Sequence, residues 1–283
     1  MKTIGIIGGD LRIIRLAEIL TKEDYLVYTY ALDKYNFLDK NIIKCNSIQE
    51  VCNNCNNIVS GVPFSKDSVF VDTPFSNVKI MIENFLKEIK NKTLIAGGIN
   101  KNTESKNIKV VDLLEIEELT ILNVIPTVEG AIKVAIEETE FTINGSKCLI
   151  LGFGRIGKLL TKSLKSLNAK VYCVARKEKD LAWIKAYGYN GINLKDLDQK
   201  LNNKYDIIFN TVPNVILDRK RLEIIKKSNP LIIELASKPW GVDFEEASKL
   251  GIKTIKAPGL PGIVAPLTSA INIKNVLEKV VEL

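Results

Sequence analysis

The glycine-rich segment at positions 152–157 constrains this chain more than any other feature. It reads Gly-Phe-Gly-Arg-Ile-Gly, and it lies between an apolar strand predicted at 147–151 and a helix predicted at 155–166. In such a segment the first glycine permits a sharp turn, the second lets a pyrophosphate approach the backbone, and the third lets the helix pack on the strand. The helix N-terminus then offers N–H groups to phosphates. The segment therefore predicts a dinucleotide-binding Rossmann domain in the C-terminal half.

The end of the next predicted strand, at 170–174, indicates which dinucleotide binds. An NAD-binding domain places an acidic residue there, where it binds the ribose 2′-OH. This chain continues with Ala175, Arg176 and Lys177 instead. Arginine at this position pairs with a 2′-phosphate and stacks on adenine. We therefore predict NADP as the cofactor, with NAD still possible, and an exposed basic turn is the simpler alternative.

Short apolar strands alternate with amphipathic helical segments along the chain, which is typical of an α/β protein with parallel sheets. We expect two doubly wound Rossmann-like domains with a cleft between them. The predicted parts are residues 1–125, a substrate or partner domain; residues 126–265, the NADP-binding domain with a bridging helix; and residues 266–283, a C-terminal helix that returns to the first domain. The bridging helix is predicted within 113–138, with a break at Pro126 and with Thr127 as N-cap of its second part.

The remaining predicted elements follow the same pattern of periodicity and turns. Strands are expected at 3–7, 25–30, 57–60, 93–96, 108–111, 205–210, 231–235 and 252–255, and helices at 11–20, 78–85 and 266–281.

Ligands of doubly wound sheets bind beyond the carboxyl ends of the strands. We therefore expect Thr211, after the strand at 205–210, and Lys238, after the strand at 231–235, to lie near the nicotinamide. An ordinary loop role is the alternative for both. The residues assigned to the cofactor are Gly152, Gly154, Arg155, Ile156, Gly157, Ala175, Arg176, Lys177, Thr211, Val212, Pro213 and Ala236.

The chain contains no histidine, which limits its chemistry. A histidine general base and a Ser-His or Cys-His nucleophile are excluded. Among the five cysteines, Cys52 and Cys55 have metal-ligand spacing, but a structural zinc site needs four ligands. We predict no metal site and two free thiols in a loop, with Cys148 and Cys173 as core residues.

The net charge of +7 comes from lysines that are spread along the chain and mixed with acidic residues. This pattern favours a solvated surface over a nucleic-acid partner. No apolar run in the sequence approaches the roughly 18 residues of a membrane span, and no signal peptide is recognisable. We expect a cytoplasmic protein that binds neither nucleic acid nor membrane.

Five segments spread over the whole chain resemble the A subunit family of dipicolinate synthase, an enzyme of endospore-forming bacteria. They are GGDLR at 8–12, NVIPTVEGAI at 123–132, the glycine-rich segment, LASKP at 235–239 and APGLPGIVAP at 257–266. The last is the most specific, because glycines and prolines in this order have little reason to recur by chance. One departure is Leu267, which follows Pro266 where a lysine is expected and weakens site assignments in this C-terminal loop.

The resemblance implies an NAD(P)-dependent oxidoreductase. It would oxidise dihydrodipicolinate, or its hydroxytetrahydro precursor, to pyridine-2,6-dicarboxylate with hydride transfer to NADP, in the mother-cell cytoplasm during sporulation. A flavoprotein-like B subunit of dipicolinate synthase is implied as partner, and we expect a homo-oligomer.

A substrate with two carboxylates needs cations, for which Arg12 and Lys238 are candidates. Without histidine, proton transfer falls to Asp10 or Glu129. We therefore assign catalysis to Asp10, Glu129 and Lys238, and substrate binding to Gly9, Arg12, Thr127 and Gly262.

Several of these assignments have simpler alternatives. Arg12 is otherwise expected in a surface salt bridge to Asp10, and Glu129 as a carboxylate that caps a helix N-terminus. For the whole chain, the alternative is a nicotinamide-binding subunit without catalysis, which acts as scaffold or regulator of a partner enzyme. A 2-hydroxy-acid or alanine dehydrogenase is a weaker alternative, because both usually use a histidine.

Overall fold

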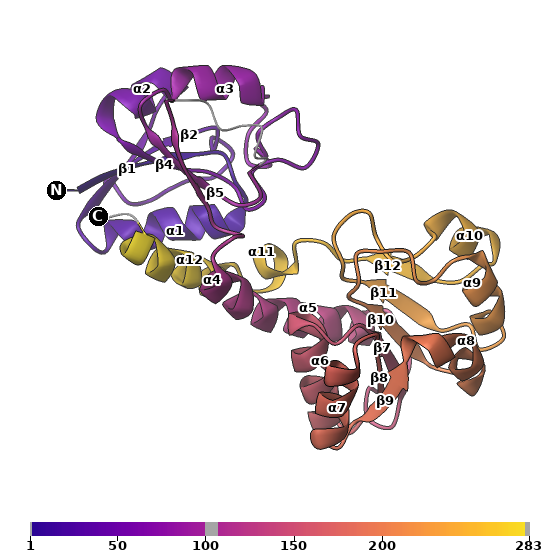
Figure 1. The fold of residues 1–283 in the computed structure, drawn as a ribbon. Coiled ribbons are helices and arrows are strands. Elements are labelled where there is room, and N and C mark those ends of the chain that lie inside the picture. Colours follow the sequence, from indigo (N-terminus) through magenta and orange to yellow (C-terminus); the bar gives the residue numbers. More distant parts are fainter. Residues whose placement is uncertain (1, 100–106, 281–283) are drawn as a thin grey trace. The chain divides into compact units, whose positions relative to one another are not determined.

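The computed structural model describes residues 2–99 and 107–280, and the chain divides into two compact units. Unit 1 comprises residues 1–123 and 261–283, and unit 2 comprises residues 124–260. In each unit, helices cover both faces of one sheet (Figure 1). The predicted cleft between two domains stays a prediction.

The sheet of unit 1 has six parallel strands in the order β3-β2-β1-β4-β5-β6. The chain adds strands on one side of β1 and then crosses to the other side, so that β1 and β4 are neighbours at the point where the order reverses. A doubly wound sheet forms its ligand site at the carboxyl ends of two such strands. The strands are β1 (Lys2–Ile7), β2 (Tyr25–Tyr30), β3 (Ile42–Lys44), β4 (Asn57–Val59), β5 (Thr93–Ala96) and β6 (Lys109–Asp112).

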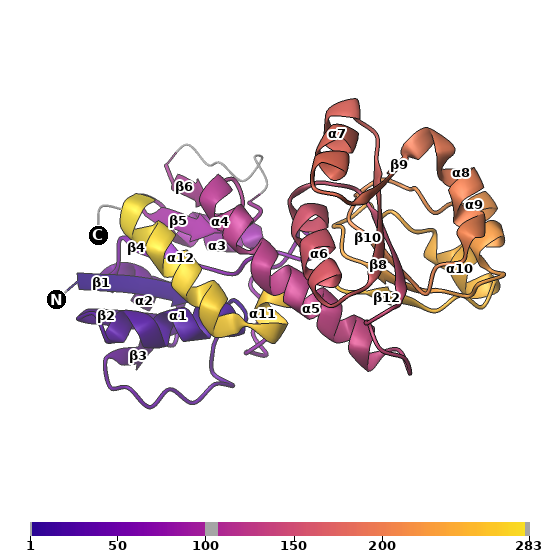
Figure 2. The same ribbon diagram turned by 90° about the horizontal axis from the view of Figure 1, so that it is seen from below.

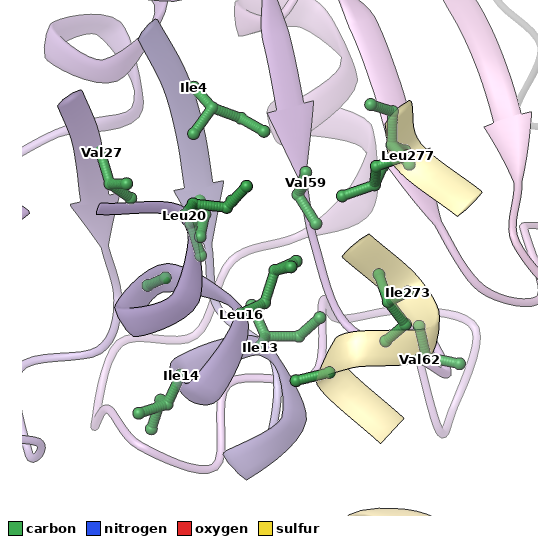
Figure 3. Packing of buried hydrophobic residues seen from close by; sticks show 14 of the residues in the cluster. Ile4, Ile13, Ile14, Leu16, Leu20, Val27, Val59, Val62, Ile273 and Leu277 are labelled. Atoms are coloured by element: carbon green, nitrogen blue, oxygen red, sulfur yellow. The ribbon is translucent and has the colours of Figure 1, made fainter. Parts of the chain in front are cut away.

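Two apolar layers hold unit 1 together, because alternate residues of each strand point to opposite faces. Ile4 and Ile6 face one layer, whereas Ile7 belongs to the other. Figure 3 shows the first layer, in which α1 packs against α12. The helices of this face are α1 (Leu11–Thr21), α4 (Glu117–Leu122) and α12 (Pro266–Val280), and those of the other face are α2 (Ile48–Asn54) and α3 (Ile82–Glu88).

Unit 2 repeats the arrangement with a sheet in the order β12-β11-β10-β7-β8-β9, again all parallel, whose order reverses between β7 and β10. Helices α5 to α7 lie on one face and α8 to α10 on the other (Figure 2). The strands are β7 (Lys147–Leu151), β8 (Lys170–Ala175), β9 (Asn190–Asn193), β10 (Ile207–Asn210), β11 (Leu231–Glu234) and β12 (Thr254–Lys256). The helices are α5 (Val124–Glu137), α6 (Arg155–Ser166), α7 (Glu178–Ala186), α8 (Leu197–Lys200), α9 (Arg219–Ile225) and α10 (Phe244–Lys249).

The two doubly wound parallel sheets confirm the predicted fold class, and several predicted boundaries are wrong. The helix predicted from 78 begins at Ile82, because Met81 instead forms an antiparallel bridge with Phe70. The bridging segment breaks at Asn123 rather than at Pro126. Pro126 is the third residue of α5, where a missing N–H costs no intrahelical hydrogen bond. Thr127 is therefore not an N-cap.

Part of the predicted C-terminal loop is also helical, since α11 spans Leu260–Val264.

The expectation that no apolar run approaches the length of a membrane span is wrong, because the segment Glu117–Glu137 is long and apolar enough to cross a membrane by length and composition. In the structure it forms two helices that meet at Asn123. Helix α4 packs on α12 within unit 1, and α5 packs on α6 and β11 within unit 2. The apolar faces of both helices thus contribute to packing inside the units, as in core helices of globular proteins.

Candidate functional site

In the glycine-rich loop of unit 2, the first and third glycines are required by close contacts, and the second faces open space. Gly152 has φ +101°, and a Cβ atom there would lie 2.5 Å from the Thr211 hydroxyl oxygen. A Cβ at Gly157 would overlap the carbonyl oxygen of Gly152, because α6 packs tightly on the loop. A Cβ at Gly154 would meet no atom within 4 Å. Backbone is therefore open to a ligand only at the second glycine, as the sequence predicts for a pyrophosphate site.

The N-terminus of α6 begins at this open position. Gly154 is the N-cap and has no side chain to make a capping hydrogen bond. The partial positive charge of a helix N-terminus favours an anion there. Arg155 and Ile156 follow as exposed and half-buried residues of the same turn.

The end of β10 forms the neighbouring wall of the site. The Thr211 hydroxyl donates to the carbonyl oxygen of Leu151 at 2.8 Å, and the Thr211 backbone N–H donates to the same oxygen at 3.0 Å. Thr211 thus joins the carboxyl ends of β7 and β10 beside Gly152. Val212 is half-buried and Pro213 is exposed.

On the other side of β7, strand β8 ends at the buried Ala175. Arg176 and Lys177 follow directly, and both side chains are exposed. In a doubly wound sheet this side of the glycine loop receives the adenosine half of a dinucleotide.

The adjacent ends of β10 and β11 carry a residue pair that was not predicted from the sequence. Asn210 and Glu234 are the last residues of β10 and β11, they lie opposite each other in register, and both are fully buried. Burial raises the pKa of Glu234, while hydrogen bonds from Asn210 and from backbone N–H groups oppose this shift. A polar residue at the end of two otherwise apolar strands, IIFN and LIIE, is the sequence signal that would have revealed them. Of the predicted residues in this loop, Ala236 is buried and Lys238 is exposed.

The corresponding turn of unit 1 is closed by the unit's own chain. The Gly9 backbone N–H donates to the Asp72 carbonyl oxygen at 2.8 Å. Asp10 is the N-cap of α1, and its carboxylate accepts from the Arg12 backbone N–H at 3.0 Å. The positions that bind phosphate in a nucleotide-binding turn are therefore already filled here.

Asp10 and Arg12 also form an ion pair between their side chains. The Arg12 Nε lies 3.0 Å from both carboxylate oxygens, and Nη2 lies 2.7 Å from one of them and donates to the Val62 carbonyl oxygen. The Arg12 residue is only 4% exposed, so this is a buried pair rather than the surface salt bridge of the simpler prediction. A Cβ at Gly262 would lie 2.6 Å from Asp10 Oδ2, so α11 packs directly on the pair.

The cysteines lie elsewhere. Cys52 is inside α2 and Cys55 is its C-cap, and both are buried, so the prediction of two thiols in a loop is wrong. Within the described part of the chain, no three His, Cys, Asp or Glu side chains form a group that could hold a metal ion.

A hollow of about 710 Å³ opens on unit 2 at the opposite end of the sheet. It is lined by residues that precede β7 and by the end of α6, namely residues 139–144 and 166–168 with Ile136. Ligands of doubly wound sheets bind at the carboxyl ends of the strands, so this hollow is not part of the dinucleotide site.

Comparisons with known proteins give one family match in each part of the chain. The profile of the N-terminal domain of the dipicolinate synthase A subunit matches residues 3–114, and that of the NAD-binding domain of D-isomer specific 2-hydroxyacid dehydrogenases matches residues 128–234. The dipicolinate synthase A subunit of Bacillus subtilis is 35% identical over 98% of this chain and 94% of its own length. The chain belongs to the family of dipicolinate synthase A subunits.

Two solved structures of this family have the same fold over nearly their whole length. The crystal structure of the dipicolinate synthase A chain from Bacillus subtilis matches with a TM-score of 0.86 and 34% identity, over 99% of this chain and 96% of that chain. The crystal structure of the A subunit from Bacillus halodurans matches with a TM-score of 0.85 and 33% identity, over 98% and 97%. Unit 2 is accordingly an NAD(P)-binding domain of a dehydrogenase type.

In this member of the dipicolinate synthase family, the structure brings some of the predicted substrate and catalytic residues together. Gly9, Asp10, Arg12 and Gly262 meet around the ion pair of unit 1. Thr127 and Glu129 both belong to α5, but they are two residues apart, so their side chains leave the helix in directions that differ by about 160°. Glu129 is not in the first turn of α5, so the simpler prediction that it caps the helix N-terminus is wrong. The roles of all these residues stay predictions.

Proposed function

We propose that this chain oxidises dihydrodipicolinate, or its hydroxytetrahydro precursor after loss of water, to pyridine-2,6-dicarboxylate, with hydride transfer to NADP bound in unit 2. The observation that carries the proposal is the open Gly154 position at the N-terminus of α6 in a member of the family of dipicolinate synthase A subunits. The cofactor, when bound, supplies the hydride acceptor. The protein supplies the pyrophosphate site, the loops at the nicotinamide end and the cations for the substrate.

Two exposed cations after β8 support NADP over NAD. Arg176 and Lys177 follow Ala175 where an acidic residue would bind the 2′-OH of NAD. A 2′-phosphate there gains charge-assisted hydrogen bonds from the arginine. We expect Arg176→Asp to weaken NADP binding by roughly 1–3 kcal/mol without weakening NAD binding. Titration of both cofactors checks this, and equal NADP affinity of the variant and the parent would contradict the assignment.

Lys238 is our main candidate for binding a substrate carboxylate, because it is exposed on the loop after β11. Arg12 is already paired with Asp10, so a substrate carboxylate at Arg12 has to share the guanidinium with that residue. Asp10 and Glu129 remain the proposed proton acceptors. We further propose that the chain forms a homo-oligomer and binds a B subunit of flavoprotein type. We also propose a cytoplasmic location, because thiols stay reduced there and all five cysteines of the chain are free.

One experiment tests the reaction directly. The purified chain is incubated with freshly generated hydroxytetrahydrodipicolinate and either NADP or NAD, and pyridine-2,6-dicarboxylate and reduced nicotinamide are measured together. Equal amounts of both products support the proposal. Product that forms only after the B subunit is added favours a non-catalytic scaffold instead.

A further inference from the structure

The buried pair at the ends of β10 and β11 has partners that explain its presence. Asn210 Nδ2 donates to Glu234 Oε1 at 2.7 Å and to the Val212 carbonyl oxygen at 2.9 Å. Glu234 accepts further hydrogen bonds from the backbone N–H groups of Ala236 and Gly241, both at 2.9 Å. Apart from each other, the two side chains therefore bind the backbone of the two loops that follow their strands.

These two loops also bind each other around Gly241. Its carbonyl oxygen accepts from the backbone N–H groups of Ile216 and Leu217, each at 2.9 Å. A Cβ at Gly241 would overlap Asn210 Nδ2 and lie 2.6 Å from the Val212 carbonyl oxygen. The loop after β11 thus lies directly on the loop after β10, with the Asn210–Glu234 pair beneath both.

Burial of these two polar side chains removes them from water, which costs free energy. Glu234 is fully buried, and the hydrogen-bond partners that it has among the described residues are Asn210 and backbone N–H groups, not Lys or Arg side chains. Apolar residues of similar size often stabilise an interior as well as buried ion pairs do, and in some proteins buried polar groups are retained because they fix one conformation. What this pair fixes is the backbone of two loops at the carboxyl edge of the sheet.

We propose that the Asn210–Glu234 pair positions the nicotinamide end of the cofactor by fixing these two loops. The loops carry Thr211, Val212 and Lys238, on the side of the glycine loop away from Arg176, where a dinucleotide places its second half. The pair acts through the backbone and does not itself touch the cofactor. The inference rests on the proposed function, namely that unit 2 binds NADP.

The test compares a whole cofactor with a fragment in the full-length protein. In Glu234→Gln one carboxylate oxygen is replaced by an NH₂ group, which only donates, so the side chain can no longer accept from the backbone N–H groups of both Ala236 and Gly241. We expect NADPH affinity to fall about 10- to 100-fold, as for the loss of a hydrogen bond to a charged group. Affinity for adenosine 2′,5′-bisphosphate, which lacks the nicotinamide half, stays unchanged. Asp206→Asn is the matched control, because Asp206 accepts from the Lys147 backbone N–H at the opposite end of the same sheet.

A spectroscopic measurement separates positioning from general destabilisation. Trp240 lies in the loop after β11, and Trp183 is the second of the two tryptophans. In a Trp183→Phe background, energy transfer from Trp240 to saturating NADPH reports how the nicotinamide lies relative to this loop. We expect the transfer efficiency to change in Glu234→Gln, whereas a purely structural role lowers the unfolding temperature and leaves the efficiency at saturation unchanged.

Gly241→Ala is the second variant, in case Glu234→Gln does not fold. It keeps Glu234 but pushes the loop away from Asn210, so the same selective loss of NADPH affinity is expected. Equal losses for NADPH and the fragment, or no loss for either, overturn this inference alone. A parent protein that fails to bind NADPH overturns the proposed function, and this inference with it.

Discussion

Replacement of Arg12 by alanine tests the buried ion pair of unit 1. The substitution removes the Nε and Nη2 donors that lie 3.0 and 2.7 Å from the Asp10 carboxylate, and it removes the donor to the Val62 carbonyl oxygen. The backbone N–H of residue 12 is retained, so the N-cap of α1 survives. The loss is therefore confined to the side-chain contacts.

The expected cost follows from the burial of each group. A hydrogen bond to a charged group contributes about 1.5–3 kcal/mol, and a buried carbonyl left without a donor costs about 1–3 kcal/mol. The Asp10 side chain is 25% exposed, so water replaces part of what it loses. We expect Arg12→Ala to lower the free energy of unfolding by about 3 kcal/mol, which corresponds to a fall in Tm of roughly 6–12 °C.

Thermal and urea unfolding measure this cost, with Arg15→Ala as control. Arg15 lies one turn further along α1, and its pair with Glu18 has an Arg15 side chain that is 36% exposed, so its removal should cost less than about 1 kcal/mol. Equal Tm values for the two variants would refute the structural role of the Arg12 pair. A normal Tm combined with a large rise in KM for substrate would instead show that Arg12 serves the ligand.

Three further outcomes are expected. Gly157→Ala should abolish NADP binding in a fluorescence titration, because its Cβ would overlap the Gly152 carbonyl oxygen and displace α6 from the loop; parental affinity would contradict this packing argument. Calorimetric titration should give one NADP per chain, since Gly9 and Asp10 already occupy the turn of unit 1; a second site of similar affinity would be evidence against it. Burial raises the pKa of Cys45 to about 11 and that of Cys55 to about 12. The thiols of the native protein should therefore resist alkylation at neutral pH and react after denaturation, and their contribution to stability should be lost as pH rises above the ordinary thiol pKa towards these values. Rapid native labelling would show that these cysteines are accessible.

The sequence predicted those parts of the fold that are determined by local patterns. Strand β7 and helix α6 match their predicted bounds because an apolar run, three glycines and an amphipathic repeat all lie within twenty consecutive residues. The predicted start of helix α3 is wrong because the residue before the helix pairs with Phe70, a contact that no local pattern encodes. The predicted N-terminus of α5 is wrong because a proline usually interrupts a helix, whereas the first turn tolerates it.

The residues of the candidate site likewise differ in whether local sequence patterns determine them. The roles of Gly152, Gly154 and Gly157 follow from spacing alone. The Asn210–Glu234 pair depends on the register of β10 and β11 and on a loop that folds back onto them. Local sequence patterns encode neither, so the contact between the two residues could not be predicted. The burial of Arg12 likewise results from α11, a segment about 250 positions further along the chain.

The two units show why a shared topology does not give a shared function. Both have the same strand order, a glycine turn after the first strand and a helix that begins there. In unit 1 the carboxylate of Asp10 occupies the N-terminus of α1, and a phosphate at the same place would be repelled by that charge. In unit 2 Gly154 leaves the N-terminus of α6 without a side-chain cap, so an anion from outside can take the position. The N-cap carboxylate, together with the bond from the Gly9 N–H to the Asp72 carbonyl oxygen, therefore closes the turn of unit 1, whereas the turn of unit 2 is available to a dinucleotide.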